Sequence, residues 1–115
     1  MLAKVFGSAV YGVNAFPITI EVNVGQGQGL FMVGLPDNAV KESAQRVESA
    51  LKHLGYFFPR QKIVVNLAPA DIRKEGAAYD LSIAVGLLAA SEQIHSKDLD
   101  KYIIMGELSL DGLLR

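Results

Sequence analysis

The sequence predicts a single α/β domain in which two helices pack on a β-sheet. Half of the 115 residues are hydrophobic, which is enough for one compact core. Short apolar runs in the first third of the chain and at 63–67 indicate strands. Apolar residues at three- and four-residue spacing in 40–54 and the apolar stretch at 81–92 indicate helices. With 20% charged residues, the composition excludes a disordered, collagen-like or coiled-coil chain.

The first third of the chain is predicted to form strands. Residues 2–11 are small and mostly apolar, and in 18–24 Ile and Val alternate with Thr, Glu and Asn, as in a half-buried strand. The glycine-rich loop 25–29 then leads to a short apolar run at 30–33. We expect 18–24 and 30–33 to pair as a hairpin.

Asp37 or Asn38 can cap the first helix, whose apolar residues recur at three- and four-residue spacing as far as Leu54. Gly55 is the predicted end of this helix. The aromatic residues at 56–58 are expected to tuck beneath the sheet. The β-branched run 63–67 that follows predicts a central strand that is buried on both faces.

The second half of the chain predicts a charged loop, a buried helix and a final hairpin. Asp80 can cap the helix, which runs from 81 to about 92 and is apolar nearly all round. Residues 102–110 predict another strand, and Asp111-Gly112 is a strong turn signal. Because the chain stops three residues after this turn, we expect it to be a fragment of a longer protein.

Several classes of protein are excluded by composition. The chain has no cysteine and two histidines, which rules out disulfide frameworks and cysteine or multi-histidine zinc sites. The longest strongly apolar run, 81–90, is too short to cross a bilayer, and no secretory signal is visible at the start. We therefore expect a cytoplasmic protein with no metal and no membrane contact.

The positive charges are concentrated in the middle of the chain. Although the net charge is −1, residues 41–74 carry +4. This asymmetry allows a local basic face for DNA or another acidic partner, while an ordinary solvated helix with its loops is the simpler interpretation. The candidate contact residues are Lys41, Arg46, Lys52, Arg73 and Lys74.

The individual motifs give little support for catalysis. The glycines of loop 25–29 precede a strand rather than a helix, and no Gly-Lys-Ser/Thr is present, so a nucleotide site is not predicted. Ser82 is expected to bond back to its own helix. Glu75 and Asp80 could act as acid and base, but we favour a structural role in which Asp80 caps the helix and Lys74 and Glu75 hold the loop. If any region is functional, it is this loop, because it joins a central strand to a buried helix.

Five motifs in order resemble the N-terminal domain of the ComM/YifB-type, magnesium-chelatase-like AAA+ ATPases. They are Val33-Gly34-Leu35-Pro36-Asp37, Val40-Lys41-Glu42-Ser43, Val65-Asn66-Leu67-Ala68-Pro69-Ala70-Asp71, Lys74-Glu75-Gly76 with Tyr79-Asp80-Leu81, and Gly106-Glu107-Leu108 with Leu110-Asp111-Gly112. The resemblance covers essentially the whole chain. It implies that residues 1–115 are one N-terminal domain resembling the Lon protease domain, with a mixed sheet and two main helices.

The same resemblance implies that the protease chemistry is missing. Lys74-Glu75-Gly76 matches the segment that precedes the Lon nucleophile, but the place of the serine is held by Ala78. The general-base lysine of Lon-type proteases would lie beyond Arg115. We therefore expect no catalytic, cofactor or metal residue in this chain. The residues that we expect to be structural in this motif are Asn66, Glu75, Gly76 and Asp80.

The resemblance further implies a longer parent protein with an ATPase module. That parent would use ATP and magnesium, form a hexamer, and drive DNA branch migration during natural transformation. Three roles then remain open for the present chain: a module that engages DNA or organises the ring, a degenerate Ser/Lys hydrolase, and a purely structural or protein-interaction module.

Overall fold

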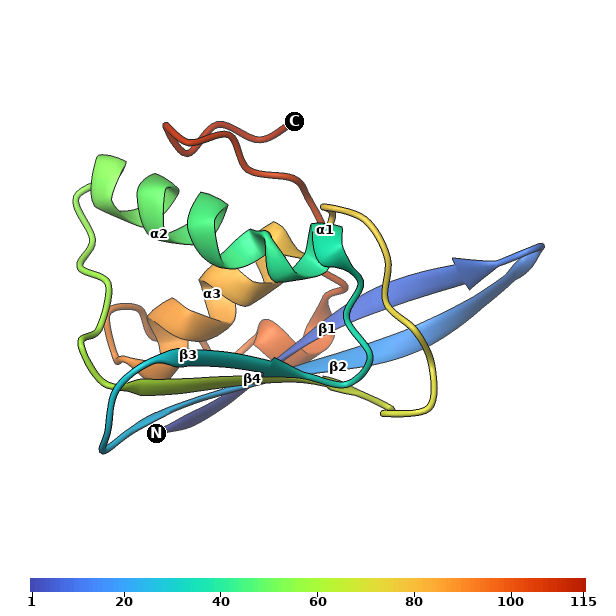
Figure 1. The fold of residues 1–115 in the computed structure, drawn as a ribbon, viewed down its shortest axis with the longest axis horizontal. Helices are drawn as coiled ribbons and strands as arrows, with labels where there is room; N and C mark the ends of the chain where they lie inside the picture. Colours follow the sequence, from blue (N-terminus) through green and yellow to red (C-terminus); the bar gives the residue numbers. More distant parts are fainter.

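A computed structural model describes residues 1–115 as two layers, a four-stranded sheet with the main helices on one of its faces (Figure 1). The strands lie in the order β1 (Leu2–Tyr11), β2 (Asn14–Gly25), β4 (Lys62–Ala68) and β3 (Leu30–Val33). The β1–β2 and β2–β4 pairs are antiparallel, whereas β3 and β4 are parallel. The predicted α/β fold with a mixed sheet and two main helices is confirmed.

The predicted hairpin between 18–24 and 30–33 is wrong, because β4 lies between these two strands. Ile63 of β4 pairs with Val24 on one side and Leu30 on the other, which places β4 inside the sheet. The glycine-rich loop passes the beginning of β4, where the Ile63 N–H donates to the Gly29 carbonyl (2.8 Å). The parallel β3–β4 pair needs a long crossover, and the segment with the first helices supplies it.

The sheet is covered on one face, so the expectation that 63–67 is buried on both faces is wrong. Ile63, Val65 and Leu67 point toward the helices and are buried, whereas Val64 and Asn66 lie on the open face and are half-buried. Side chains of a strand point alternately to its two faces. The buried residues of β4 therefore alternate with residues that are more polar or more exposed.

The first predicted helix is divided at Glu42 into α1 (Asn38–Lys41) and α2 (Ser43–His53). Asp37 caps α1 as predicted, since its Oδ1 accepts from the Val40 N–H (2.8 Å). Gly55 ends α2 as predicted, with a φ of +89° that few other residues adopt easily. The predicted boundaries of this segment are therefore confirmed.

Helix α3 (Asp80–Ala90) is the buried helix that the sequence predicts. It packs on β1 and β2 and also contacts α2. Gly86 allows this close approach, because a Cβ at that position would lie 2.7 Å from Cγ2 of Val22 on β2. The side chain of Asp80 does not cap the helix, contrary to expectation; Tyr79 is at the N-cap position, and its side chain makes no capping hydrogen bond.

The predicted strand at 102–110 is absent. A short 3₁₀ helix, η1 (Leu99–Lys101), is followed by an extended segment that makes only isolated bridges, at Ile103 with Phe6 and at Leu108 with Leu114. Its backbone bonds both β1 and the beginning of α3: the Ile104 N–H donates to the Phe6 carbonyl (2.8 Å), and the Leu81 N–H donates to the Gly106 carbonyl (3.0 Å). The predicted turn at Asp111-Gly112 is present between the bridged leucines.

One hydrophobic core lies between the helices and the sheet and contains 19 buried residues, drawn mainly from β1, β2, β4 and the three helices, with Leu30 and Met32 of β3 partly buried against it. The far end of the β1–β2 hairpin extends beyond this core (Figure 1). None of the helices is long and apolar enough to cross a membrane.

Candidate functional site

The loop between β4 and α3 is fastened by Lys74, whose side chain is fully buried. Its Nζ donates to the carbonyls of Gly34 (2.8 Å) and Pro69. Its backbone N–H donates to the Leu35 carbonyl (3.0 Å), which ties the loop to the segment after β3. Burial lowers the pKa of Lys74, because the charged ammonium loses hydration there. Lys74 therefore has no exposed ammonium for a phosphate, and its assignment to a basic surface is wrong.

Asp80, at the beginning of α3, is fully buried and joins two helices and the C-terminal segment. Its carboxylate accepts from Arg46 Nε (2.6 Å) and Nη2 (3.0 Å), from the hydroxyl of Ser43, and from the Leu108 N–H (3.1 Å). The hydrogen bond from Arg46 to Asp80 raises the pKa of Arg46.

The guanidinium of Arg46 is therefore directed into the protein. Besides its bonds to Asp80, its Nη2 donates to the Ala39 carbonyl (2.9 Å), and its side chain is only 20% exposed. The expectation that Arg46 belongs to an open basic face is wrong, because a guanidinium bound to a buried carboxylate has few donors left for another anion.

Glu75 and Asp80 do not form an acid–base pair, because Glu75 is exposed and Asp80 is buried. Glu75 lies near Arg73, with 3.5 Å between Oε1 and Nε. Gly76 has a φ of +86° and donates its N–H to Asp37 Oδ2 (3.2 Å), which agrees with a structural role. Asn66 lies on the open face of the sheet, where its Nδ2 donates to Glu21 (2.8 Å). Asn66 is thus separated by the sheet from Asp80.

Two other side chains in this region were tested as nucleophile positions. Ala78 is exposed and presents a methyl group where the Lon pattern has a serine. The hydroxyl of Ser82 is buried and donates to the Ile104 carbonyl, across to the C-terminal segment rather than back along its own helix as predicted. Neither residue therefore presents a free hydroxyl at this position.

The remaining basic candidates lie in two groups at opposite ends of α2. Lys41 and Arg73 line a cavity of about 460 Å³ with Asp37 and Asn38. Lys52 lines a different cavity of about 440 Å³ with Arg60. Because α2 has 11 residues, its ends are roughly 16 Å apart. The structure does not gather the five predicted contacts on one face.

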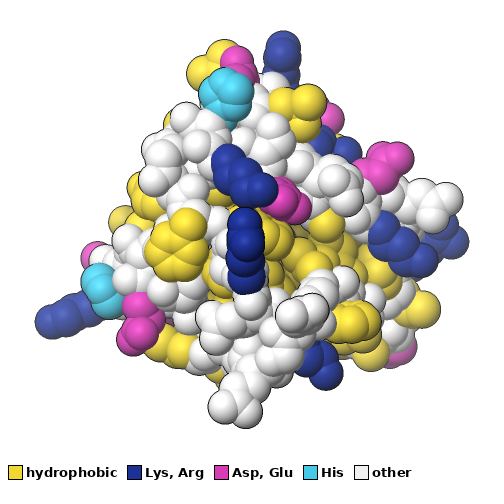
Figure 2. Space-filling model, turned by 60° about the vertical axis from the view of Figure 1, so that its left-hand side comes forward, with side chains coloured by type: hydrophobic (Ala, Val, Ile, Leu, Met, Phe, Trp, Pro, Cys, Tyr) yellow, Lys and Arg dark blue, Asp and Glu magenta, His cyan; other side chains and the backbone are white.

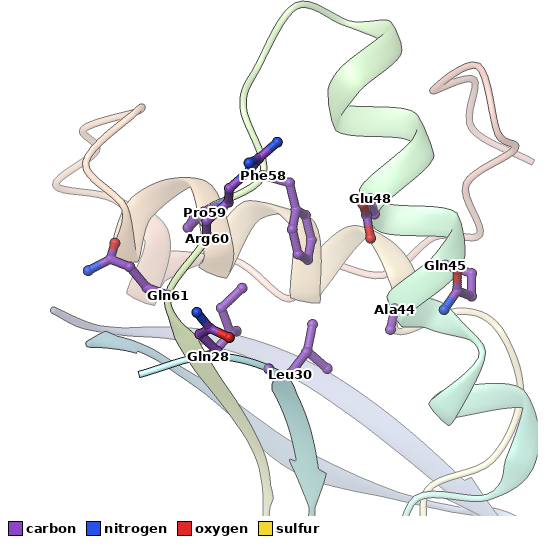
Figure 3. Close-up of a pocket in the computed structure, with 11 residues that line it drawn as sticks. Gln28, Leu30, Ala44, Gln45, Glu48, Phe58, Pro59, Arg60 and Gln61 are labelled. Atoms are coloured by element: carbon purple, nitrogen blue, oxygen red, sulfur yellow. The ribbon is translucent and has the colours of Figure 1, made fainter. Parts of the chain in front are cut away.

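The largest cavity is a cleft of about 530 Å³ between α2, the beginning of β3 and the loop that precedes β4 (Figure 3). Leu30, Ala44 and Phe58 point into it, and polar side chains surround them. Figure 2 shows Lys and Arg side chains beside a hollow with hydrophobic side chains at its base. The polar lining residues are Gln28, Gln45, Glu48, Arg60 and Gln61.

Sequence reasoning missed the aromatic loop after α2. Tyr56 and Phe57 were expected beneath the sheet, but both are exposed, and only Phe58 packs against the core. The signal in the sequence was an aromatic run directly after a helix-ending glycine and before Pro59 and Arg60. This pattern is typical of a loop at the surface. Nothing in the sequence pointed to Gln93, which fixes the backbone of this loop.

Two features of this chain bear on phosphate and metal binding. The glycine-rich loop opens β3 rather than a helix, so its amides are not gathered toward a phosphate. No group of three or more His, Asp or Glu side chains is placed to hold a metal ion. The fold and these contacts define a two-layer α/β domain whose buried polar groups hold its own segments together.

Comparison with known proteins gives the family. The family described as subunit ChlI of Mg-chelatase matches residues 20–115. Over 115 residues, which are 99% of the chain, it is 57% identical to YifB of Salmonella typhimurium and 55% identical to YifB of Escherichia coli. It is 47% identical to the competence protein ComM of Haemophilus influenzae over the same share. The chain therefore belongs to the ComM/YifB-type family of magnesium-chelatase-like proteins. It spans 23% of the length of each of these relatives.

Proposed function

We propose that this chain is a non-catalytic accessory domain of a magnesium-chelatase-like AAA+ ATPase that acts on DNA. The observation that carries the proposal is that the polar side chains around the β4–α3 loop bond to other parts of the same domain. Lys74 and Asp80 are buried and bonded within the domain, and Ala78 stands where a Lon-type protease has its nucleophile. A domain built in this way supplies a rigid surface rather than reacting groups.

The remainder of the parent protein would supply the motor. In this proposal the parent binds ATP and magnesium, assembles as a hexamer in the cytoplasm, and drives DNA branch migration. The similarity to a competence protein supports a role in natural transformation. The present domain would then help to organise the hexameric ring or bind the DNA.

Deletion of residues 1–115 from the full-length protein tests this proposal. We expect ATP hydrolysis to persist while branch migration of a synthetic Holliday junction is lost or strongly reduced, because an accessory domain is needed for coupling and not for the chemistry of ATP. Undiminished branch migration by the truncated protein would show that the domain is dispensable.

A protein-interaction module without direct DNA contact is the second candidate. The observation that favours it is the division of the basic residues, since Arg46 and Lys74 are internal and the others lie at two ends of α2. Measurement of branched-DNA binding at low and moderate salt separates the two, because phosphate contacts weaken as salt rises.

A degenerate Ser/Lys hydrolase is the least supported alternative, and peptidase assays on the full-length protein test it. We expect no turnover of peptide or ester substrates.

A further inference from the structure

Phe57 is an exposed aromatic residue on a fixed backbone. Its side chain is 61% exposed, yet its N–H donates to Gln93 Oε1 (3.0 Å) and its carbonyl accepts from Gln93 Nε2 (2.9 Å). The next two residues, Phe58 and Pro59, are packed into the fold. A ring presented on a loop that is already ordered costs little further entropy when it binds a partner.

Positive side chains lie beside this ring. Lys52 and Arg60 line the same cavity as Tyr56 and Phe57. Arg60 makes no salt bridge. Lys52 forms one salt bridge, to Glu48 (2.7 Å), and because both side chains are largely exposed to solvent, this ion pair contributes little stability. Both cations are therefore accessible to an anion.

The aromatic cavity continues into the cleft of Figure 3. The two cavities share Glu48, Phe58 and Arg60, so they form one groove along α2. At the far part of this groove the lining changes from rings and cations to side-chain amides, which can both donate and accept hydrogen bonds. These amides belong to Gln28, Gln45 and Gln61.

We propose that this groove binds single-stranded nucleic acid, with a base stacked on Phe57 and phosphates held by Lys52 and Arg60. Exposed rings beside cations are the combination that binds single strands, since every base offers a flat face and every linkage a charge. An acidic peptide would use the cations but not the flat rings, and a duplex hides its base faces. The inference rests on the proposed function, because it names the DNA contact of the accessory domain.

The test is fluorescence anisotropy of the 115-residue chain with a labelled oligothymidylate of about 16 nucleotides. Phe57→Ala is compared with Phe31→Ala, which removes a half-exposed ring from the open face of β3, where the ring also lies near a cation, Lys62, but outside the groove. We expect Phe57→Ala to weaken binding roughly tenfold, as for one stacked base, and Phe31→Ala to leave it within about twofold. Phe57→Leu keeps the apolar bulk and is expected to weaken binding as well, because it lacks a flat face.

The charge contribution is tested with two matched double variants. Lys52→Gln with Arg60→Gln should lower the slope of log affinity against log salt by about 1.4, the value for two phosphates of a single strand. Lys41→Gln with Arg73→Gln removes the same charge at the other end of α2 and should leave the slope nearly unchanged. Circular dichroism checks that each variant is folded.

Three results would overturn the inference: no binding of the oligonucleotide, equal losses for Phe57→Ala and Phe31→Ala, or a larger effect of the Lys41 and Arg73 pair. Binding of an oligoglutamate peptide in place of the oligonucleotide would also overturn it and assign the groove to an acidic protein. None of these results decides the accessory role, which is judged separately by the deletion in the full-length protein.

Discussion

At the scale of single residues, the carboxylate of Asp80 joins parts of the chain that are far apart in sequence. It binds Arg46 of α2 and the backbone of Leu108, and it is fully buried. We expect Asp80→Ala to lower the free energy of unfolding by about 3–5 kcal/mol, because it leaves a guanidinium partly buried without its partner. Urea denaturation measures this loss.

Asp80→Asn and Asp100→Ala are the controls for this prediction. Asp80→Asn keeps an acceptor oxygen and should cost less than Asp80→Ala. Asp100 is exposed on η1, so Asp100→Ala should change stability by less than about 0.5 kcal/mol. If Asp80→Ala were no more harmful than Asp100→Ala, the proposed joint between α2, α3 and the C-terminal segment would be wrong.

Lys74 gives a prediction for the dependence of stability on pH. Burial lowers its pKa below the ordinary value of 10.5 in the folded state, so between these two values the unfolded chain holds more protons than the folded one. The free energy of unfolding should therefore rise with pH in this window, relative to a Lys74→Met variant that lacks the titration. Urea midpoints of both proteins from neutral pH to above pH 10 measure the difference, and a difference that falls with pH would contradict the assignment.

Gly34 combines a left-handed backbone with a close contact. Its φ is +103°, and a Cβ there would lie 2.1 Å from the Leu67 carbonyl oxygen of β4. We expect Gly34→Ala to destabilise the domain by at least about 2 kcal/mol. Gly12 has a φ of +62° with nothing within 4 Å, so Gly12→Ala isolates the backbone strain and should cost less. Equal thermal shifts for the two variants would argue against the contact.

At the scale of elements, the packing of α3 on β2 depends on Gly86. An alanine there has the higher helix propensity, but its Cβ would lie 2.7 Å from Val22 Cγ2. We expect Gly86→Ala to cost about 1–3 kcal/mol because the core is overpacked. A double-mutant cycle with Val22→Ala should show a favourable coupling of at least about 0.5 kcal/mol, and strict additivity would show that the helix shifts freely instead.

The helices were predictable from the sequence because their signals are local. The Asp37 cap, the Gly55 stop and the apolar run of α3 each lie within a few residues of the boundary that they set. Strand order is not local: Ile63 separates Val24 from Leu30, although the loop between those two strands resembles a hairpin. The strand expected at 102–110 failed for the same reason, since its backbone bonds to α3 depend on tertiary structure.

The candidate site was predictable only in part. The count of positive charges in 41–74 is a property of the sequence, but whether each charge faces solvent is decided by its partners. Arg46 donates to the carboxylate of Asp80, which is 34 residues away in the sequence, and Lys74 donates to the Gly34 carbonyl, which is 40 residues away. The aromatic loop was visible as a run of residues, but its backbone is held by Gln93, which no pattern in the sequence connects to Phe57.

At the scale of the whole molecule, the helices and the sheet share one core, and this predicts how the domain unfolds. The 19 core residues come from both layers, and the radius of gyration is 13.0 Å, as for a compact domain of this length. We expect a single cooperative transition in urea, with a slope of about 1–3 kcal/mol per molar.

Far-UV circular dichroism and tyrosine fluorescence provide the two probes for this transition. The former follows the helices, while the latter follows Tyr79 in the core together with the tyrosines at the surface. Because Asp80 connects α2 and α3 to the C-terminal segment, the two curves should coincide in the native protein and separate in Asp80→Ala, where that segment is released first. Two separate transitions in the unmodified chain would mean that the C-terminal segment folds independently of the core.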